Sequence, residues 1–136
     1  MLHQDRLEEI ASICIDCGYH LHRDLGPGLL ESAYEILLAK VLENRGLAIR
    51  RQISLPLRYQ GVVVDNAFKI DLLVEDCLVL ELKSTERLAA VHSKQVLTYL
   101  RLMNLPLGLL MNFGQATFKA GLQRVVNDYQ GDFRKR

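Results

Sequence analysis

The 136-residue chain carries a formal net charge of +1, with 49% hydrophobic and 24% charged residues. This composition is typical of a soluble globular protein, and the length fits a single domain over residues 1–136. The small net charge excludes a strongly basic protein whose whole surface attracts phosphate. No apolar stretch approaches the length of a bilayer-spanning helix, and residues 1–6 lack the pattern of a signal peptide. We therefore expect a cytoplasmic protein without a membrane partner.

Residues 5–24 have the spacing of an amphipathic helix. Its apolar stripe consists of Leu7, Ile10, Cys14, Cys17 and Leu21. The two cysteines form a C-x-x-C motif, but Cys77 stands apart and no second pair completes a zinc site, so packing is favoured over a redox or zinc role. His20 and His22 are two residues apart, which separates them on a helix, and we interpret both as surface residues rather than ligands.

A second helix is predicted over residues 29–45, after the break at Gly26-Pro27-Gly28 and before Gly46. Its expected core stripe consists of Leu30, Ala33, Leu37 and Val41. Glu31 and Tyr34 lie on the shoulder of this stripe, one turn apart. The pattern alone allows Glu31 to be an N-terminal charge that interacts with the helix dipole.

Residues 47–59 alternate loosely and are predicted to form a strand, in which Pro56 implies an edge position or a bulge. A turn at Gln60-Gly61 leads into the next strand. That strand runs over residues 62–71 with an irregularity at Asp65-Asn66.

A third helix is predicted over residues 89–103, followed by a short buried strand over residues 107–112 and a final strand over residues 117–126. The tail is formed by residues 128–136, of which residues 131–136 are expected to fray. The order of helix, helix, three strands, helix and two strands predicts a mixed α/β sheet with helices on its faces.

The most informative stretch runs from Lys69 to Lys83 and has the pattern of two apolar strands joined by the acidic turn Glu75-Asp76. Charged residues at Asp71, Glu81 and Lys83 interrupt these apolar runs. Buried charges are costly unless they are paired or bound to a metal ion. We therefore expect the charges inside this hairpin to be paired or bound to a metal ion, although the pattern alone equally allows an edge hairpin with solvated charges.

The length of the turn decides whether the carboxylates meet. A two-residue turn sends Asp71 and Glu81 to opposite faces, whereas a three-residue turn pairs Val74 with Leu78. In the second register, which we expect, the carboxylates lie opposite each other and Lys83 shares their face. Opposed carboxylates repel each other unless a cation lies between them, and magnesium suits such oxygen ligands. A neighbouring ammonium group can stabilise charge on a phosphate or help to deprotonate the attacking water.

This arrangement resembles the PD-(D/E)XK nuclease superfamily, with Asp71 as its Asp and Glu81-Leu82-Lys83 as its (D/E)-x-K motif. Ile70 stands where the superfamily often has Pro. Gly28-Leu29-Leu30-Glu31-Ser32-Ala33-Tyr34 is similar to the G-x-x-E-x-x-Y signature that names a family of small bacterial proteins within the superfamily. The resemblance extends to about Asn127 through Gly46-Leu47, Gln52, Tyr59-x-Gly61, Asp71-Leu72-Leu73-Val74, His92-x-x-Gln95-x-x-x-Tyr99-Leu100 and Gly108-Leu109-Leu110-x-Asn112-Phe113-Gly114.

The resemblance implies a restriction-endonuclease-like fold. Its αβββαβ core would occupy residues 28–127, with a mixed central sheet flanked by helices. Residues 1–25 would then form an additional N-terminal helix. The implied chemistry is hydrolysis of a phosphodiester, with Mg²⁺, or alternatively Mn²⁺, as Lewis acid and template.

The resemblance also implies roles for individual residues. The implied metal ligands are Asp71, Glu81, Glu31 and the backbone carbonyl of Leu82. Glu31 would act directly or through a water, and Lys83 would orient or deprotonate the attacking water. The implied substrate-binding and supporting residues are His92, Gln95, Tyr99 and Tyr34. Gln95 and Tyr99 form a Q-x-x-x-Y that recurs in the recombination-exonuclease branch, although they can also cap the sheet edge, and His92 can equally be a structural histidine.

Two functions remain to be compared. The leading interpretation is a magnesium-dependent nuclease that acts on DNA, which the intact Asp71, Glu81 and Lys83 favour. The alternative is a catalytically inactive nucleic-acid-binding or protein-interaction module, which the small size and near-zero net charge favour. The same features fit dependence on a homo-oligomer or a partner protein. Four arginines can line a DNA-binding face or be scattered solvated charges, namely Arg45, Arg50, Arg51 and Arg58.

Overall fold

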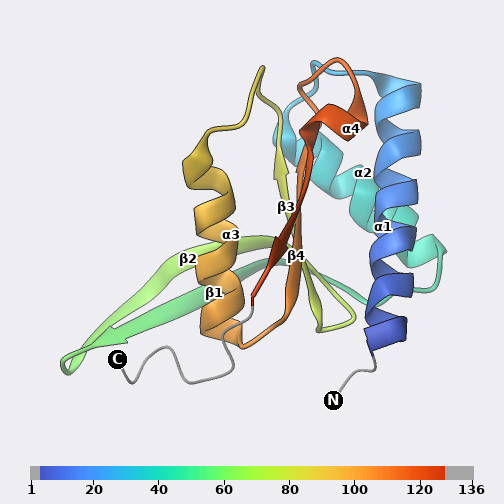
Figure 1. The fold of residues 1–136 in the computed structure, drawn as a ribbon. Coiled ribbons are helices and arrows are strands. Elements are labelled where there is room, and N and C mark those ends of the chain that lie inside the picture. Colours follow the sequence, from blue (N-terminus) through green and yellow to red (C-terminus); the bar gives the residue numbers. More distant parts are fainter. Residues whose placement is uncertain (1–3, 128–136) are drawn as a thin grey trace.

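A five-stranded mixed sheet separates two long helices on one face from a third helix on the other (Figure 1). The computed structural model describes residues 4–127. The elements are α1 (Gln4–Leu25), α2 (Glu31–Asn44), β1 (Ile49–Tyr59), β2 (Val62–Val74), β3 (Leu78–Lys83), α3 (Ala90–Met103), β4 (Leu107–Asn112), α4 (Phe118–Gly121) and β5 (Leu122–Val126). The predicted α/β class, with its additional N-terminal helix, is confirmed. The tail that was expected to fray lies outside the described residues.

The strands lie in the order in which they occur in the chain, β1-β2-β3-β4-β5. β3 and β4 are parallel, and the other three pairs are antiparallel. A parallel pair needs a crossover connection, which α3 supplies. Among residues 4–127, no helix is both long and apolar enough to cross a bilayer.

Alternation along β3 divides the core between the two faces of the sheet. Leu80 and Leu82 pack with α1 and α2, whereas Val79 packs with Val96 and Leu100 of α3. Because successive side chains of a strand point to opposite faces, Glu81 and Lys83 lie on the α3 side. The charged residues of β3 therefore face the helix that carries the Q-x-x-x-Y motif.

β1 and β2 form a long ribbon whose outer part extends beyond the body of the domain (Figure 1). Both expectations for Pro56 are confirmed, because β1 is an edge strand and its register with β2 shifts between Leu55 and Leu57. The predicted irregularity in β2 is also confirmed, since Asn66 has a φ of 56°. The turn at Gln60-Gly61 closes the ribbon as predicted.

The predicted core stripe of α2 is wrong by one residue. Leu30 is 77% exposed, and Leu37 and Val41 are also exposed. The buried residues are Tyr34, Glu35, Leu38, Ala39 and Leu42. Both stripes are apolar enough to satisfy the sequence pattern, and packing selects the one in which Tyr34 stacks on Phe113 with ring centroids 4.4 Å apart.

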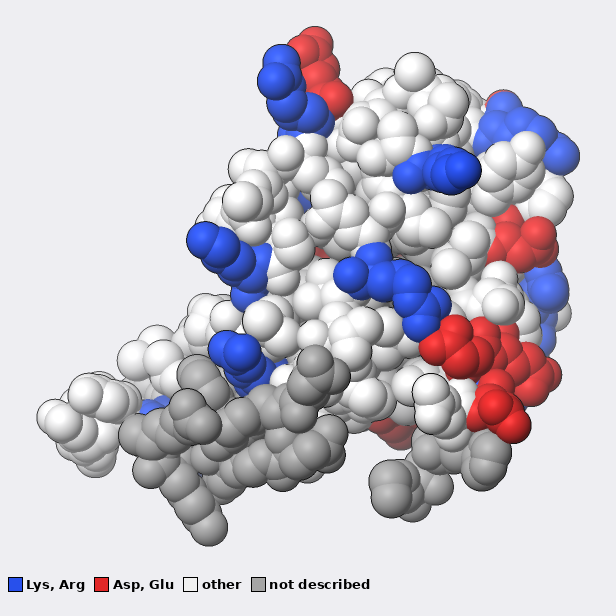
Figure 2. Space-filling model, viewed as in Figure 1, with Lys and Arg blue, Asp and Glu red and all other residues white. Residues whose placement is uncertain are grey.

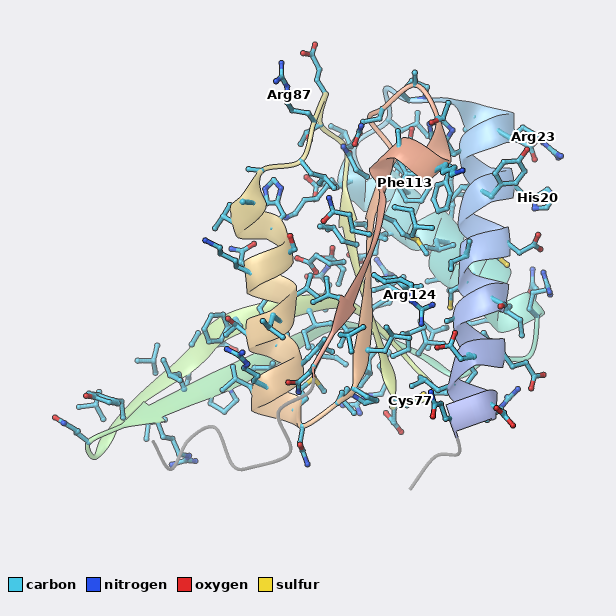
Figure 3. The ribbon with its side chains drawn as sticks, viewed as in Figure 1. His20, Arg23, Cys77, Arg87, Phe113 and Arg124 are labelled. Carbon is cyan, nitrogen blue, oxygen red and sulfur yellow. The ribbon has the colours of Figure 1, made fainter. Side chains whose placement is uncertain are left out.

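Two further predictions are corrected near the C-terminal end of α1. His22 is buried rather than exposed, and its Nε2 lies 2.8 Å from the carbonyl oxygen of Gln115. The reason is that α4 packs over this end of α1, whereas His20 projects outward as expected (Figure 3). The segment predicted as one strand over residues 117–126 begins with α4, which Thr117 caps by accepting the amide hydrogen of Ala120 at 3.2 Å.

The cysteines of α1 pack in the core as predicted. Cys14 and Cys17 are both buried among apolar residues. Burial raises the pKa of the Cys14 thiol to about 12, which keeps it protonated and unreactive at neutral pH.

Candidate active site

β2 and β3 separate at the position of the two predicted carboxylates. Their ladder ends at the Leu72–Leu80 pair, beyond which β2 stays with β1 and β3 stays with β4. We call this point the fork. Side-chain hydrogen bonds replace the ladder there: Asp71 Oδ2 accepts the amide hydrogen of Leu82 at 2.9 Å, and the Asp71 amide donates to Glu81 Oε1 at 3.4 Å. The fork therefore brings both carboxylates together.

The three-residue turn expected from the sequence is confirmed. Val74 pairs with Leu78, and the amide of Cys77 donates to the Val74 carbonyl at 3.0 Å. Glu75 and Asp76 adopt left-handed backbone conformations with φ values of 52° and 54°. This turn sets the register that places Asp71 and Glu81 on the same face of the sheet.

Glu81 is a buried carboxylate without a full counter-charge. It is 4% exposed, and Lys83 Nζ lies 3.8 Å from its Oε2 atom. Burial, followed by the neighbouring Asp71 carboxylate, raises the pKa of Glu81 to about 8, against the opposing effect of Lys83. Glu81 therefore holds a proton at neutral pH when no other cation is present.

Tyr99 of α3 faces the same carboxylates. It is buried, and burial together with the charges of Glu81 and Asp71 raises the pKa of its hydroxyl to about 12. The hydroxyl therefore stays protonated and can donate a hydrogen bond. Phe68 contacts the ring edge-on with centroids 5.7 Å apart, which fixes its position. Gln95 lies one turn earlier on α3 and is exposed to solvent.

His92 accepts a hydrogen bond from the backbone at the start of α3. Its Nδ1 accepts the amide hydrogen of Ala89 at 3.1 Å, at the first turn of α3. This bond satisfies one of the amides that a helix leaves unpaired at its N-terminus. It matches the structural alternative that the sequence left open for His92.

Tyr34 was expected to support substrate binding, and its placement contradicts a direct contact. The side chain is fully buried, and its hydroxyl donates to the carbonyl oxygen of Gly26. The amide of Leu29 in turn lies 3.4 Å from the Tyr34 hydroxyl oxygen. Figure 3 shows Phe113, on which the Tyr34 ring stacks, inside the fold. Tyr34 therefore anchors the loop before α2, because the buried stripe of α2 passes through it.

The carboxylate that α2 directs toward the fork belongs to Glu35 rather than Glu31. Glu31 is the exposed first residue of α2, and within residues 4–127 it does not form a group with the hairpin carboxylates that could hold a metal ion. Glu35 is buried, and its Oε1 accepts a hydrogen bond from Gln52 Nε2. The same Nε2 lies 3.4 Å from Asp71 Oδ1. Glu35 Oε2 accepts from Arg51 Nε and Nη2 at 3.2 and 2.9 Å.

Sequence reasoning missed Glu35 for an identifiable reason. A carboxylate four residues after Glu31 lies on the same helix face, so the spacing offered the signal. The error of one residue in the predicted core stripe placed Glu35 itself on the surface instead. Gln52 was recognised only as one of the matching family positions, without a role.

The donor set at the fork fits a hard divalent cation. Two carboxylates lie together, and one of them is buried and is paired within residues 4–127 with one lysine, at 3.8 Å. Magnesium commonly uses one or two carboxylates and keeps several waters. A closed site of three or more carboxylate, histidine or cysteine ligands is not present in the described part of the chain. The expected direct contribution of Glu31 to a three-carboxylate site is therefore not observed.

Three of the four arginines on or beside β1 are engaged in ion pairs. Arg45 pairs with Asp16, Arg50 with Asp76 and Arg51 with Glu35, at distances of 3.1, 3.0 and 2.9 Å. Figure 2 shows Lys and Arg scattered over the visible face, with acidic residues gathered over the beginning of α1. This distribution fits the alternative of scattered charges better than that of a continuous phosphate-binding stripe.

Comparison with known families shows which family the chain belongs to. The family model described as the PD-(D/E)XK nuclease superfamily matches residues 8–125, from the first turns of α1 to the end of β5. The chain belongs to this superfamily. Nucleases of the superfamily act on nucleic acids and generally use divalent metal ions. Searches of curated proteins and of solved structures found no match. The narrower resemblance to the G-x-x-E-x-x-Y family stays a prediction.

The raised pKa of Glu81 predicts how the stability of the metal-free protein depends on pH. Below the ordinary value of 4.5, Glu81 is protonated in both the folded and the unfolded chain. Between pH 4.5 and about 8 the unfolded chain releases this proton while the folded chain keeps it, so the free energy of unfolding should fall across that window by on the order of a few kcal/mol. Glu81→Gln should not show this contribution.

Melting temperatures in the presence of a chelator test this prediction. The advantage of Glu81→Gln over wild type should widen between pH 5 and pH 8. A constant difference between the two proteins across that range would show that the pKa of Glu81 is not raised in the folded protein.

Proposed function

We propose that this member of the superfamily is a magnesium-dependent nuclease that hydrolyses phosphodiester bonds in DNA. The observation that carries the proposal is the fork, where Asp71 and the buried Glu81 lie together beside Lys83 without full charge compensation. A fold gains no stability from such a pair, because burying like charges is costly. The arrangement is therefore best explained by a cation and a reaction.

The proposed roles follow the positions of the side chains. The carboxylates of Asp71 and Glu81 hold the ion, with the carbonyl of Leu82 as a further oxygen ligand. Magnesium or manganese, when bound, acts as a Lewis acid and as a template for water and phosphate. Lys83 orients the attacking water or stabilises negative charge as it develops on the phosphate. Glu31 stays a prediction as a carboxylate that acts through water.

The α3 residues provide the proposed contacts to the substrate. Tyr99 carries a protonated hydroxyl near the carboxylates, and a hydrogen bond from it to a phosphate oxygen would position the scissile group. Gln95 is exposed one turn away and is proposed to contact the same strand. DNA is preferred over RNA because of the similarity of this Q-x-x-x-Y pair to the recombination-exonuclease branch.

An inactive interaction module is the second candidate. It is favoured by the ion pairs of Arg45, Arg50 and Arg51, which leave these side chains less able to attract phosphate. Under this alternative the nuclease fold would serve as a scaffold for a protein partner or for a second copy of the chain.

A substrate panel distinguishes the two candidates. Single- and double-stranded DNA and RNA are incubated with wild type, Lys83→Ala and the matched control Lys40→Ala, which changes an exposed lysine on α2. The proposal expects cleavage of DNA by wild type and by the control with Mg²⁺ or Mn²⁺, and none with a chelator. Cleavage of RNA alone would contradict the DNA assignment, and no cleavage of any substrate would favour the module.

A further inference from the structure

Gln52 interrupts β1 with an unusual backbone conformation. Its φ is 51°, in the left-handed region, while the flanking pairs Arg51–Leu72 and Ile53–Ile70 keep the strand in register. A residue with a side chain is strained in this region and persists there only where surrounding contacts hold it. Contacts of Gln52 with its surroundings must therefore hold this backbone conformation.

The side chain links two carboxylates from different elements. Gln52 Nε2 donates to Glu35 Oε1 of α2, and the same nitrogen lies 3.4 Å from Asp71 Oδ1 of β2. An amide nitrogen has two hydrogens, so it can serve both acceptors at once. Glu35 is itself fixed, because it is buried and its other oxygen accepts two hydrogen bonds from Arg51.

Both oxygens of the Asp71 carboxylate are consequently engaged. Oδ1 faces Gln52, and Oδ2 accepts the Leu82 amide hydrogen at 2.9 Å. Two donors on opposite oxygens fix the plane of the carboxylate, and each oxygen keeps a lone pair for a cation. Hydrogen bonds of this kind orient the carboxylates that bind metal ions.

We propose that Glu35 and Gln52 are positioning residues that hold the Asp71 carboxylate in the orientation needed to bind the divalent cation. The inference rests on the proposed function, because it assumes that Asp71 is a metal ligand. It also gives a reason for the backbone of Gln52, whose conformation allows one side chain to reach both Glu35 and Asp71.

Two substitutions of Gln52 separate metal binding from backbone strain. Gln52→Ala and Gln52→Gly both remove the bridging amide, but only glycine adopts a φ of 51° without strain. Both variants should bind Mn²⁺ about 10-fold more weakly or worse than wild type, as loss of a partner to a metal ligand typically does. Gln52→Gly should nevertheless melt at a higher temperature than Gln52→Ala.

The ribbon offers a matched control. Gln60 is also a glutamine with a positive φ, 48°, but it is exposed at the turn between β1 and β2. Gln60→Gly therefore makes the same chemical change in a similar backbone conformation away from the fork. Its affinity for Mn²⁺ should equal that of wild type.

Two substitutions of Glu35 test whether this residue holds Gln52 in place through a hydrogen bond. Glu35→Gln keeps an oxygen that can accept from Gln52, whereas Glu35→Ala removes it. The Mn²⁺ affinity of Glu35→Gln should therefore lie closer to that of wild type than the affinity of Glu35→Ala does.

Titration of the full chain with Mn²⁺ measures the affinity for the ion without any need for cleavage. The free ion is followed by its electron paramagnetic resonance signal. Circular dichroism melting of each variant shows that it is folded at the temperature of the titration. Weaker binding by both Gln52 variants, with normal binding by Gln60→Gly, supports the inference. Equal binding by wild type and the Gln52 variants overturns the inference and leaves the proposed function standing. Absence of Mn²⁺ binding by wild type contradicts the proposed function itself.

Discussion

Lys83→Ala should lower the rate of metal-dependent DNA cleavage by about 10²-fold or more, which is the usual cost of removing one electrostatic stabiliser. Lys83 Nζ lies 3.8 Å from Glu81 Oε2, beside the proposed site of reaction. Its charge matters most when negative charge builds up on the phosphate, so the loss should fall on the transition state. The affinity for DNA should change much less, because one phosphate contact provides only part of the electrostatic attraction.

The measurement compares binding and single-turnover cleavage on the same DNA at saturating Mg²⁺. Saturation matters because Lys83 also lowers the pKa of Glu81, so its removal should change the affinity for the metal as well. Gln95→Ala and Tyr99→Phe should show the reverse balance, with a larger effect on DNA affinity than on the rate, if these residues position the strand. A Lys83→Ala protein that cleaves as fast as wild type would remove Lys83 from the mechanism.

Asp71→Asn should abolish stabilisation of the protein by magnesium without unfolding the metal-free domain. At a metal concentration 100 times the dissociation constant, a single site stabilises the fold by about 2.7 kcal/mol, and the variant should lose this increment. The metal-free fold should be retained because the substitution removes the Asp71 charge, which together with burial raises the pKa of Glu81 and makes its charged form costly. The asparagine oxygen can also still accept the Leu82 amide hydrogen.

Thermal melting of Asp71→Asn with Mg²⁺ and with a chelator measures the stabilisation by the metal ion and the stability of the metal-free fold. Asp76→Asn, which changes an exposed carboxylate in the turn between β2 and β3, serves as the matched control. The control should respond to Mg²⁺ as wild type does. An equal Mg²⁺-dependent shift in Asp71→Asn would show that the metal binds elsewhere.

The hairpin could be predicted from the sequence because its determinants are local. Two apolar runs, an acidic turn and the alternation of side chains limited the hairpin to two registers, and the expected Val74–Leu78 register is the one observed. That register places Asp71 opposite Glu81. The separation of β2 from β3 beyond this point could not be predicted, because it depends on which strands pair farther along the sheet.

The contribution of α2 could not be predicted because its periodicity is ambiguous. One apolar stripe passes through Leu37 and Val41, and another passes through Leu38 and Leu42. Only the tertiary packing of Tyr34 on Phe113 selects the second. The same rotation of the helix brings Glu35 inward, whereas Glu31 lies one turn earlier on the same face and stays exposed as the first residue of α2.

The role of Gln52 was also outside the reach of sequence reasoning. A left-handed glutamine inside a strand has no signature in composition or periodicity, since glycine and asparagine are the residues usually expected there. The buried position of His22 was missed for a related reason. Its contact with Gln115 joins residues that are far apart in the chain, and no local pattern reports such a contact.

Titration of the wild-type chain with Mn²⁺ at pH 8 shows directly whether Asp71 and Glu81 bind one divalent cation at the fork. We expect one saturable site per chain, competition by Mg²⁺, and loss of that site in the Asp71→Asn, Glu81→Gln double variant. Binding by the double variant with the affinity of wild type, or no saturable binding by wild type, would contradict this expectation.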